Sequence, residues 1–83
     1  MLTPDEQREV VQSFLADFEK IRAEAGVVVF GIKVSSLLYA CLRVAEELEF
    51  NKGDVFCQGF LVNVDPEWSG IQYIYEVKTN KTE

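Results

Sequence analysis

The stretch Gly26-Val27-Val28-Val29-Phe30-Gly31-Ile32-Lys33-Val34 is the most apolar and β-branched run of the chain. Since β-branched and aromatic residues favour strands, it predicts a strand over residues 27–34. Side chains alternate along a strand, so this one has an apolar face of Val28, Phe30, Ile32 and Val34 and a second face of Val27, Val29, Gly31 and Lys33. The second face becomes polar towards Lys33, which predicts full burial of the first face and partial burial of the second.

A long amphipathic helix is predicted before this strand, over residues 4–25. Thr3 can cap the helix, Pro4 suits the first helical position, and Glu6 completes a capping box three residues after the cap. Apolar residues then recur at helical spacings of three and four, at Val10, Val11, Phe14, Leu15, Phe18, Ile21 and Ala25. Gly26 is suited to end this helix.

A second helix is predicted over residues 36–49, with Ser35 or Ser36 as its cap. Its apolar positions have helical spacing, at Leu37, Leu38, Cys41, Leu42, Ala45 and Leu48. Residues 36–44 also alternate as a strand would. The good helix formers at 45–49 favour the helix.

Two further strands are predicted over residues 55–64 and 71–77, with residues 78–83 as a frayed tail. Residues 51–54 form a turn, and we interpret Gln58-Gly59 as a bulge in the first of these strands. Residues 65–70 connect the two strands as a hairpin. The sequence therefore predicts a single two-layer α+β domain over residues 1–83, in the order α-β-α-β-β.

Connection rules then favour a three-stranded antiparallel sheet of order 1-3-2, packed against two helices. In this arrangement residues 27–34 form an edge strand with an unpaired backbone side. The sheet face away from the helices would carry Val27, Val29, Lys33, Gln72, Ile74 and Glu76.

The composition limits the classes of partner. With 83 residues, the core is thin, and a homodimer or a tightly bound partner would add buried surface. A net charge of −6 argues against direct binding to nucleic acid and favours a protein partner with a basic surface. No apolar run approaches the ~20 residues of a membrane span. The acidic start differs from a signal peptide, so we expect the cytoplasm of the host cell.

Catalytic chemistry is not predicted. The chain has no histidine, which removes the commonest general base and metal ligand. The five glycines form no phosphate-binding motif, and Cys41 and Cys57 lack zinc-site spacing. These two cysteines are expected to be free, buried thiols. We therefore expect neither an enzyme nor a cofactor or metal site.

Three features remain as candidates for partner binding. The first is an acidic cluster made of Glu46, Glu47, Glu49 and Asp54, which either docks onto basic side chains or forms a solvated face. The second is Trp68 beside Glu67 in a short loop, where the indole either binds a partner or covers the core. The third is the pair Tyr73 and Tyr75, which are either core aromatics or part of a recognition surface with Trp68.

The segment Phe56-Cys57-Gln58-Gly59-Phe60-Leu61-Val62-Asn63-Val64-Asp65-Pro66, followed by Gly70, resembles a strand-and-turn pattern of short phage-encoded proteins. The resemblance implies a phage or mobile-element source and carries no activity. The leading hypothesis is a small acidic protein-binding module, a phage-encoded inhibitor that blocks a basic surface of a host nucleic-acid-handling (defence) complex. The alternatives are a homo-oligomeric structural or assembly protein of a phage or mobile element, and a small ligand-binding domain or enzyme.

Overall fold

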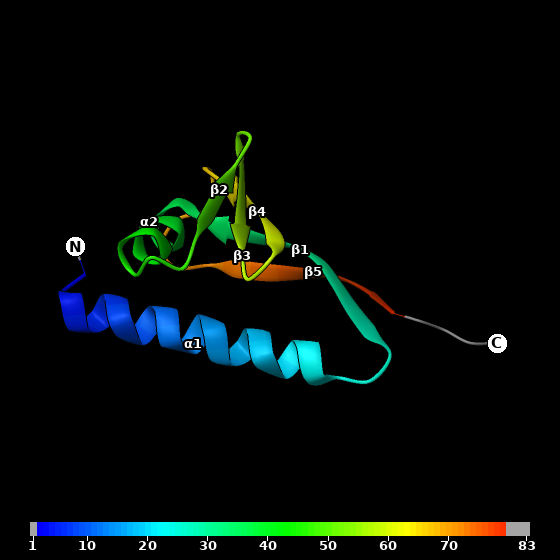
Figure 1. The fold of residues 1–83 in the computed structure, drawn as a ribbon. Coiled ribbons are helices and arrows are strands. Elements are labelled where there is room, and N and C mark those ends of the chain that lie inside the picture. Colours follow the sequence, from blue (N-terminus) through cyan, green and yellow to red (C-terminus); the bar gives the residue numbers. More distant parts are fainter. Residues whose placement is uncertain (1, 80–83) are drawn as a thin grey trace.

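The computed structural model describes residues 2–79 of the chain. Its elements are α1 (Pro4–Ala23), β1 (Val27–Ser35), α2 (Ser36–Val44), β2 (Glu49–Asn51), β3 (Asp54–Cys57), β4 (Phe60–Asp65) and β5 (Tyr73–Thr79) (Figure 1). The strands form one five-stranded mixed sheet in the order β2-β3-β4-β1-β5. This is a small α+β domain with two helices, as predicted, but the sheet is neither three-stranded nor wholly antiparallel.

Helix α1 begins as its sequence predicts. The Glu6 amide donates to Thr3 Oγ1 at 3.2 Å, and the Thr3 amide donates to Glu6 Oε1 at 2.9 Å, which completes the capping box. These hydrogen bonds from Thr3, the backbone one first, lower the pKa of the Glu6 carboxyl. The helix ends at Ala23, two residues before the predicted end. Its buried side chains, Val11, Phe14 and Phe18, face the sheet and α2.

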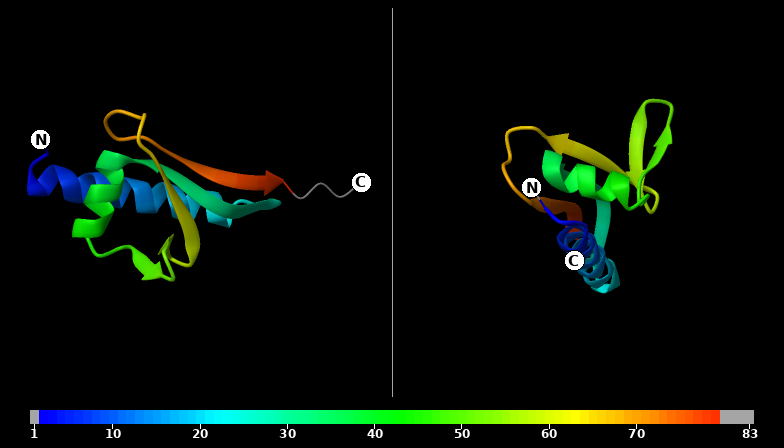
Figure 2. Two further views of the ribbon diagram at one scale, coloured as in Figure 1. Left: turned by 90° about the horizontal axis from the view of Figure 1, so that it is seen from above. Right: turned by 90° about the vertical axis from the view of Figure 1, so that its left-hand side faces the viewer.

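Strand β1 lies inside the sheet, so the prediction of an edge strand is wrong. It pairs in parallel with β4 and antiparallel with β5. The segment between β4 and β5 is therefore not a hairpin: it carries the chain past the end of β1, and β5 pairs on the far side (Figure 2). The predicted strand order 1-3-2 is therefore wrong, because it assumed a hairpin at this connection. Strand β5 also starts at Tyr73 rather than 71 and includes residues 78–79 of the predicted tail, whereas 80–83 lie outside the described residues.

The buried side chain of Ser35 joins three segments at this point. Its hydroxyl donates to the Gly70 carbonyl at 2.7 Å and accepts from the amides of Gln72 at 3.1 Å and Leu38 at 3.4 Å. The Ser35 amide also donates to the Gln72 carbonyl at 2.8 Å. The residue that caps α2 therefore also holds the incoming chain of β5 against β1.

A bulge at Phe30 changes which side chains of β1 share a face. Val29 pairs with Val77 and Gly31 with Glu76, so Phe30 is the extra residue. Val29, Ile32 and Val34 are buried, whereas Val28 and Phe30 are 55% and 51% exposed. The prediction that Val28, Phe30, Ile32 and Val34 form one buried face is therefore wrong. A bulge shifts the alternation by one residue, which a strict period of two does not anticipate.

Helix α2 ends at Val44, so the prediction of a helix to residue 49 is wrong. The Glu46 amide donates to the Arg43 carbonyl and the Glu47 amide to the Leu42 carbonyl, both at 3.0 Å, which is the pattern of a Schellman motif. Glu46 has a φ of 60°, in the left-handed region. The turn redirects the chain into β2, which begins at Glu49.

Replacing Glu46 with glycine is expected to raise the free energy of unfolding by about 1 kcal/mol. A left-handed conformation costs most residues roughly 1–2 kcal/mol, and glycine avoids that strain at the cost of some additional backbone entropy. Urea denaturation of the purified protein measures the change. Glu46→Ala is the matched control, because it removes the same charge and keeps the strain. An equal gain in both variants would assign the effect to charge and contradict the conformational explanation.

The predicted strand 55–64 is divided into β3 and β4 by a turn at Gln58-Gly59. Both residues have positive φ, and Cys57 pairs with Phe60 across them. This is a two-residue hairpin of type I′ geometry, and the interpretation as a bulge is wrong. The predicted turn at 51–54 is of the same kind, with Lys52 and Gly53 at positive φ.

The core lies between the two helices and one face of the sheet. Its buried members from both helices and from β1, β3 and β4 form one cluster, made of Val11, Phe14, Phe18, Val29, Ile32, Val34, Leu38, Cys41, Leu42, Cys57 and Val62. Both helices cover the same face (Figure 2). Within the described residues, no element covers the other face, which we call the open face.

Candidate functional site

Tyr73 and Tyr75 lie on the helix-covered face of the sheet. The Tyr75 ring stacks on Phe18 with centroids 5.2 Å apart, and its hydroxyl donates to the Phe14 carbonyl at 2.6 Å. The Tyr73 hydroxyl donates to the Asp17 carboxylate. Burial, with help from Asp17, raises the pKa of Tyr73 to about 12, and burial raises the pKa of Tyr75 as well. Both side chains are thus neutral phenols that anchor β5 to α1.

Arg22 closes the same aromatic cluster at the C-terminal end of α1. Its guanidinium lies 5.2 Å from the Phe18 ring centroid and 5.3 Å from that of Phe60, and it donates to Gln58 Oε1 at 2.8 Å. A cation over two aromatic faces stabilises the packing of α1 on the β3–β4 turn. The sequence does not predict this role for Arg22, because two of its three partners, Gln58 and Phe60, lie 36 and 38 residues away.

The four acidic candidates are divided between two places. Glu46 and Glu47 lie in the turn after α2, and Glu47 is half-buried. Glu49 begins β2 and Asp54 begins β3. Burial, and then the charges of Glu47 and Glu49, raise the pKa of the buried Cys57 thiol to about 11. The thiol is therefore protonated at neutral pH.

Glu49 and Asp54 share the open face, as the strand registers show. Glu49 pairs with Phe56, and Phe56 pairs with Leu61, so these three side chains point the same way. Asp54 lies two residues before Phe56 and points with it. Leu61 precedes the buried Val62 and points away from the core. Glu49 on β2 and Asp54 on β3 therefore lie on the same side of the sheet as the open face.

Trp68 is half-buried beside the open face. Lys33 Nζ lies 5.4 Å from the centroid of its ring and 3.5 Å from Asp65 Oδ2. The Trp68 amide donates to the Asp65 carbonyl at 3.3 Å, and the amide of the exposed Glu67 donates to Asp65 Oδ1 at 3.0 Å. The loop that holds Glu67 and Trp68 lies at the opposite end of the sheet from the β2–β3 hairpin (Figure 2). The structure does not bring Trp68 together with Tyr73, Tyr75 or Glu46.

The open face carries exposed apolar side chains with charged ones, Lys33 and Glu76, between them. Its exposed large side chains come from β1, β4 and β5, and they are Val28, Phe30, Leu61 and Ile74. Cross-strand pairing sets Ile74 beside Lys33 and Val28 beside Lys78, and Lys78 Nζ lies 5.4 Å from the Phe30 ring centroid. A patch of exposed apolar and charged side chains on an uncovered sheet face is a candidate contact surface for a protein partner. This patch is the best candidate for a functional surface, and the sequence predicted only Ile74, Lys33 and Glu76 of its members.

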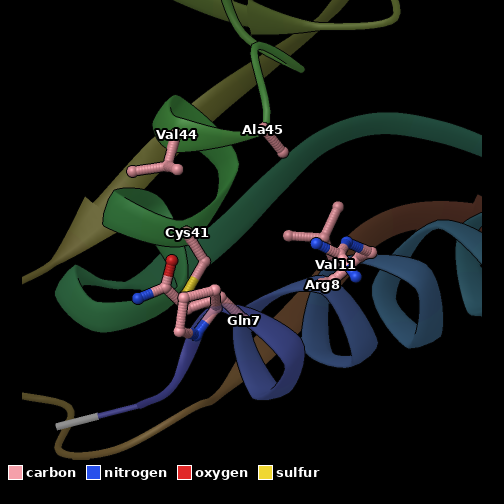
Figure 3. Close-up of a pocket in the computed structure, with 7 residues that line it drawn as sticks. Gln7, Arg8, Val11, Cys41, Val44 and Ala45 are labelled. Atoms are coloured by element: carbon pink, nitrogen blue, oxygen red, sulfur yellow. The ribbon is translucent and has the colours of Figure 1, made fainter.

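A groove of about 240 Å³ lies between α1 and α2 (Figure 3). Small-molecule sites are usually larger, at roughly 300–1,000 Å³. Its polar side chains have partners on α1 or just before it: the Gln7 amide donates to the Leu2 carbonyl, and Arg8 pairs with Asp5 at 3.1 Å. The Cys41 thiol in its wall is buried, and burial raises its pKa.

Comparisons of the chain with protein families, curated proteins and solved structures found no match. Within residues 2–79, no helix is long and apolar enough to cross a membrane. In the same range, no three His, Cys, Asp or Glu side chains are grouped to hold a metal ion.

Proposed function

We propose that the protein is a non-catalytic protein-binding module that docks through the open face of its sheet. The observation that carries the proposal is the exposure of Val28, Phe30, Leu61 and Ile74 on that face, while both helices pack on the other. Burying such side chains against a partner contributes about 25 cal/mol per Å² of apolar surface. Trp68 at the rim adds an aromatic side chain of the type enriched at interface hot spots.

The partner is a protein that presents an apolar patch bordered by lysine or arginine. Glu49 and Asp54 extend the open face on its β2–β3 side, and the chain has a net charge of −6. Opposite charge on the partner would guide its approach and fix its orientation. A basic surface of a host nucleic-acid-handling complex has this chemistry. The acidic composition and the phage-like pattern at residues 56–70 support an inhibitor that occupies such a surface.

The test begins with capture of the partner from host lysate and its identification by mass spectrometry. The affinity of the purified partner is then measured for the double variant Phe30→Ser and Ile74→Ser. Each side chain is about half exposed, so the variant should fold, and loss of two interface anchors is expected to weaken binding about 100-fold. Leu37→Ser with Val44→Ser is the matched control, because it removes two exposed apolar side chains from α2.

The affinity of the same complex, measured over a range of salt concentrations, tests the role of Glu49 and Asp54. Charge reversal at Glu49 and Asp54 is expected to slow association and to flatten the dependence of affinity on salt. Reversal at Glu46 and Glu47 serves as the comparison on the helix side. Unchanged affinity in the Phe30 and Ile74 variant, together with loss in the Glu46 and Glu47 variant, would overturn docking through the open face.

A further inference from the structure

We infer that β5 is the pairing edge of a homodimer, in which β5 of a second copy joins it antiparallel with Val77 opposite Val77. The inference starts from the sheet order, in which β5 pairs with β1 on one side only. Its other backbone side has no partner within the described residues. This assembly is independent of the proposed partner-binding function, because it concerns the strand edge rather than the face.

The two edge strands of the sheet, β2 and β5, differ in how strongly they resist pairing with a strand of another molecule. Strand β2 has three residues and an acidic side chain at its start, and short charged edges are poor templates for another strand. Strand β5 has seven residues and contains no proline, and the bulge of the β1–β5 ladder lies in β1. Its two charged side chains, Glu76 and Lys78, have opposite signs, so they oppose pairing with an arbitrary strand and permit pairing with a strand of complementary charge. Strand β5 is therefore the edge suited to a partner strand.

The charges of β5 select a second copy and one register. With Val77 at the two-fold axis, Glu76 of each copy lies opposite Lys78 of the other, which gives two cross-strand ion pairs on the open face. A register centred on Glu76 would place like charges opposite each other. One centred on Tyr75 would set Ile74 against Glu76. Only the register at Val77 is charge-complementary, and it also packs two partly exposed Val77 side chains together.

In the single chain, Lys78 lies against the Phe30 ring and the Glu76 carboxylate lies over β1, so both side chains turn outward to form these ion pairs. Neither takes part in an ion pair among the described residues. The half-buried Glu76 carboxylate lies across β1, where a Cβ on Gly31 would be 2.8 Å from Glu76 Oε1. Gly31 thus leaves room for the Glu76 carboxylate over β1, on the side of β5 away from its free edge. Pairing of the two β5 strands would also join the two open faces into one continuous surface.

Sedimentation velocity over a concentration series tests the dimer in the full chain of 9.5 kDa. Lys78→Glu places four carboxylates around the axis and is expected to weaken dimerisation at least about tenfold, since cross-strand pairs contribute roughly 0.2–1 kcal/mol each and like charges oppose pairing. Glu76→Lys should weaken it similarly. The double variant, Glu76→Lys with Lys78→Glu, restores both ion pairs in reverse and is expected to recover the dimer.

Lys20→Glu, on the exposed face of α1, is the matched charge control and should leave dimerisation unchanged. Circular dichroism of each variant confirms that it is folded. A monomer at all concentrations of the wild-type chain would overturn the inference. A wild-type dimer that Lys78→Glu leaves intact, or that the folded double variant does not restore, would overturn the β5 register.

Discussion

Phe18→Ala is expected to lower the free energy of unfolding by about 3–5 kcal/mol, the range measured for large-to-small changes at buried aromatic positions. The Phe18 side chain is fully buried and its ring stacks on Tyr75, with the Phe60 ring edge-on at 5.3 Å. Its removal leaves a cavity and also takes away one of the two rings under the Arg22 guanidinium. Because small domains have only about 5–15 kcal/mol of stability, this variant should be close to unfolding at 25 °C.

Urea denaturation followed by far-ultraviolet circular dichroism measures this loss. Phe50→Ala is the matched control, because the Phe50 side chain on β2 is 61% exposed. Its effect is expected to stay within about 0.5 kcal/mol. A loss below about 1 kcal/mol for Phe18→Ala, or equal losses in both variants, would contradict the assignment of Phe18 to the centre of the core.

Ser35→Ala is expected to cost about 2–3 kcal/mol of folding free energy, a large effect for the loss of one oxygen atom. Removal of a helix N-cap typically costs about 1 kcal/mol. The same change also removes the part-buried hydrogen bonds that the hydroxyl makes with the Gln72 amide and the Gly70 carbonyl, and each lost hydrogen bond costs roughly 0.5–1.5 kcal/mol. The loop before β5 should loosen in parallel.

Thermal and urea unfolding of Ser35→Ala, with Ser36→Ala beside it, separate this role from simple capping. Ser36 is exposed and is the first residue of α2. Its replacement is expected to change the free energy of unfolding by less than about 0.5 kcal/mol. Hydrogen exchange should show faster exchange of the Gln72 amide in Ser35→Ala alone. A loss of about 1 kcal/mol with no change at Gln72 would reduce Ser35 to a helix cap.

Short-range sequence signals predicted the start of α1, the position of β1 and the start of α2. The capping box at Thr3 and Glu6 gave the start of α1, and the β-branched run gave β1. Ser35, one of the two proposed caps, starts α2. In each case the residues that determine the structure are close together in the sequence, where propensity and capping operate.

The errors arise where contacts distant in sequence decide the structure. Residues 45–49 are good helix formers but are not helical, because Glu46 adopts a left-handed conformation and Glu49 pairs with Phe56 in the sheet. The position of β5 depends on contacts between Ser35 and residues 70–72, which lie 35–37 positions away. Propensity is a weak prior that such tertiary contacts override.

The candidate site was predictable in part. Alternation placed Ile74, Glu76 and Lys33 on the face away from the helices, as the structure has them. The bulge at Phe30 exchanged Val27 and Val29 for Val28 and Phe30 on that face. Gly31 was the available signal, because a glycine inside a strand often marks a bulge or a close backbone approach. The tyrosine hydroxyls and the Lys33–Trp68 contact depend on tertiary geometry that the sequence does not encode locally.

Chemical-shift mapping by NMR tests the central claim, docking through the open face, most directly. The isotope-labelled protein is titrated with the captured partner, and the perturbed amides are placed on the structure. We predict the largest changes at Val28, Phe30, Leu61 and Ile74, with smaller ones at Glu49 and Asp54. Perturbations confined to the groove between α1 and α2, with the open face unchanged, would contradict the proposed docking surface.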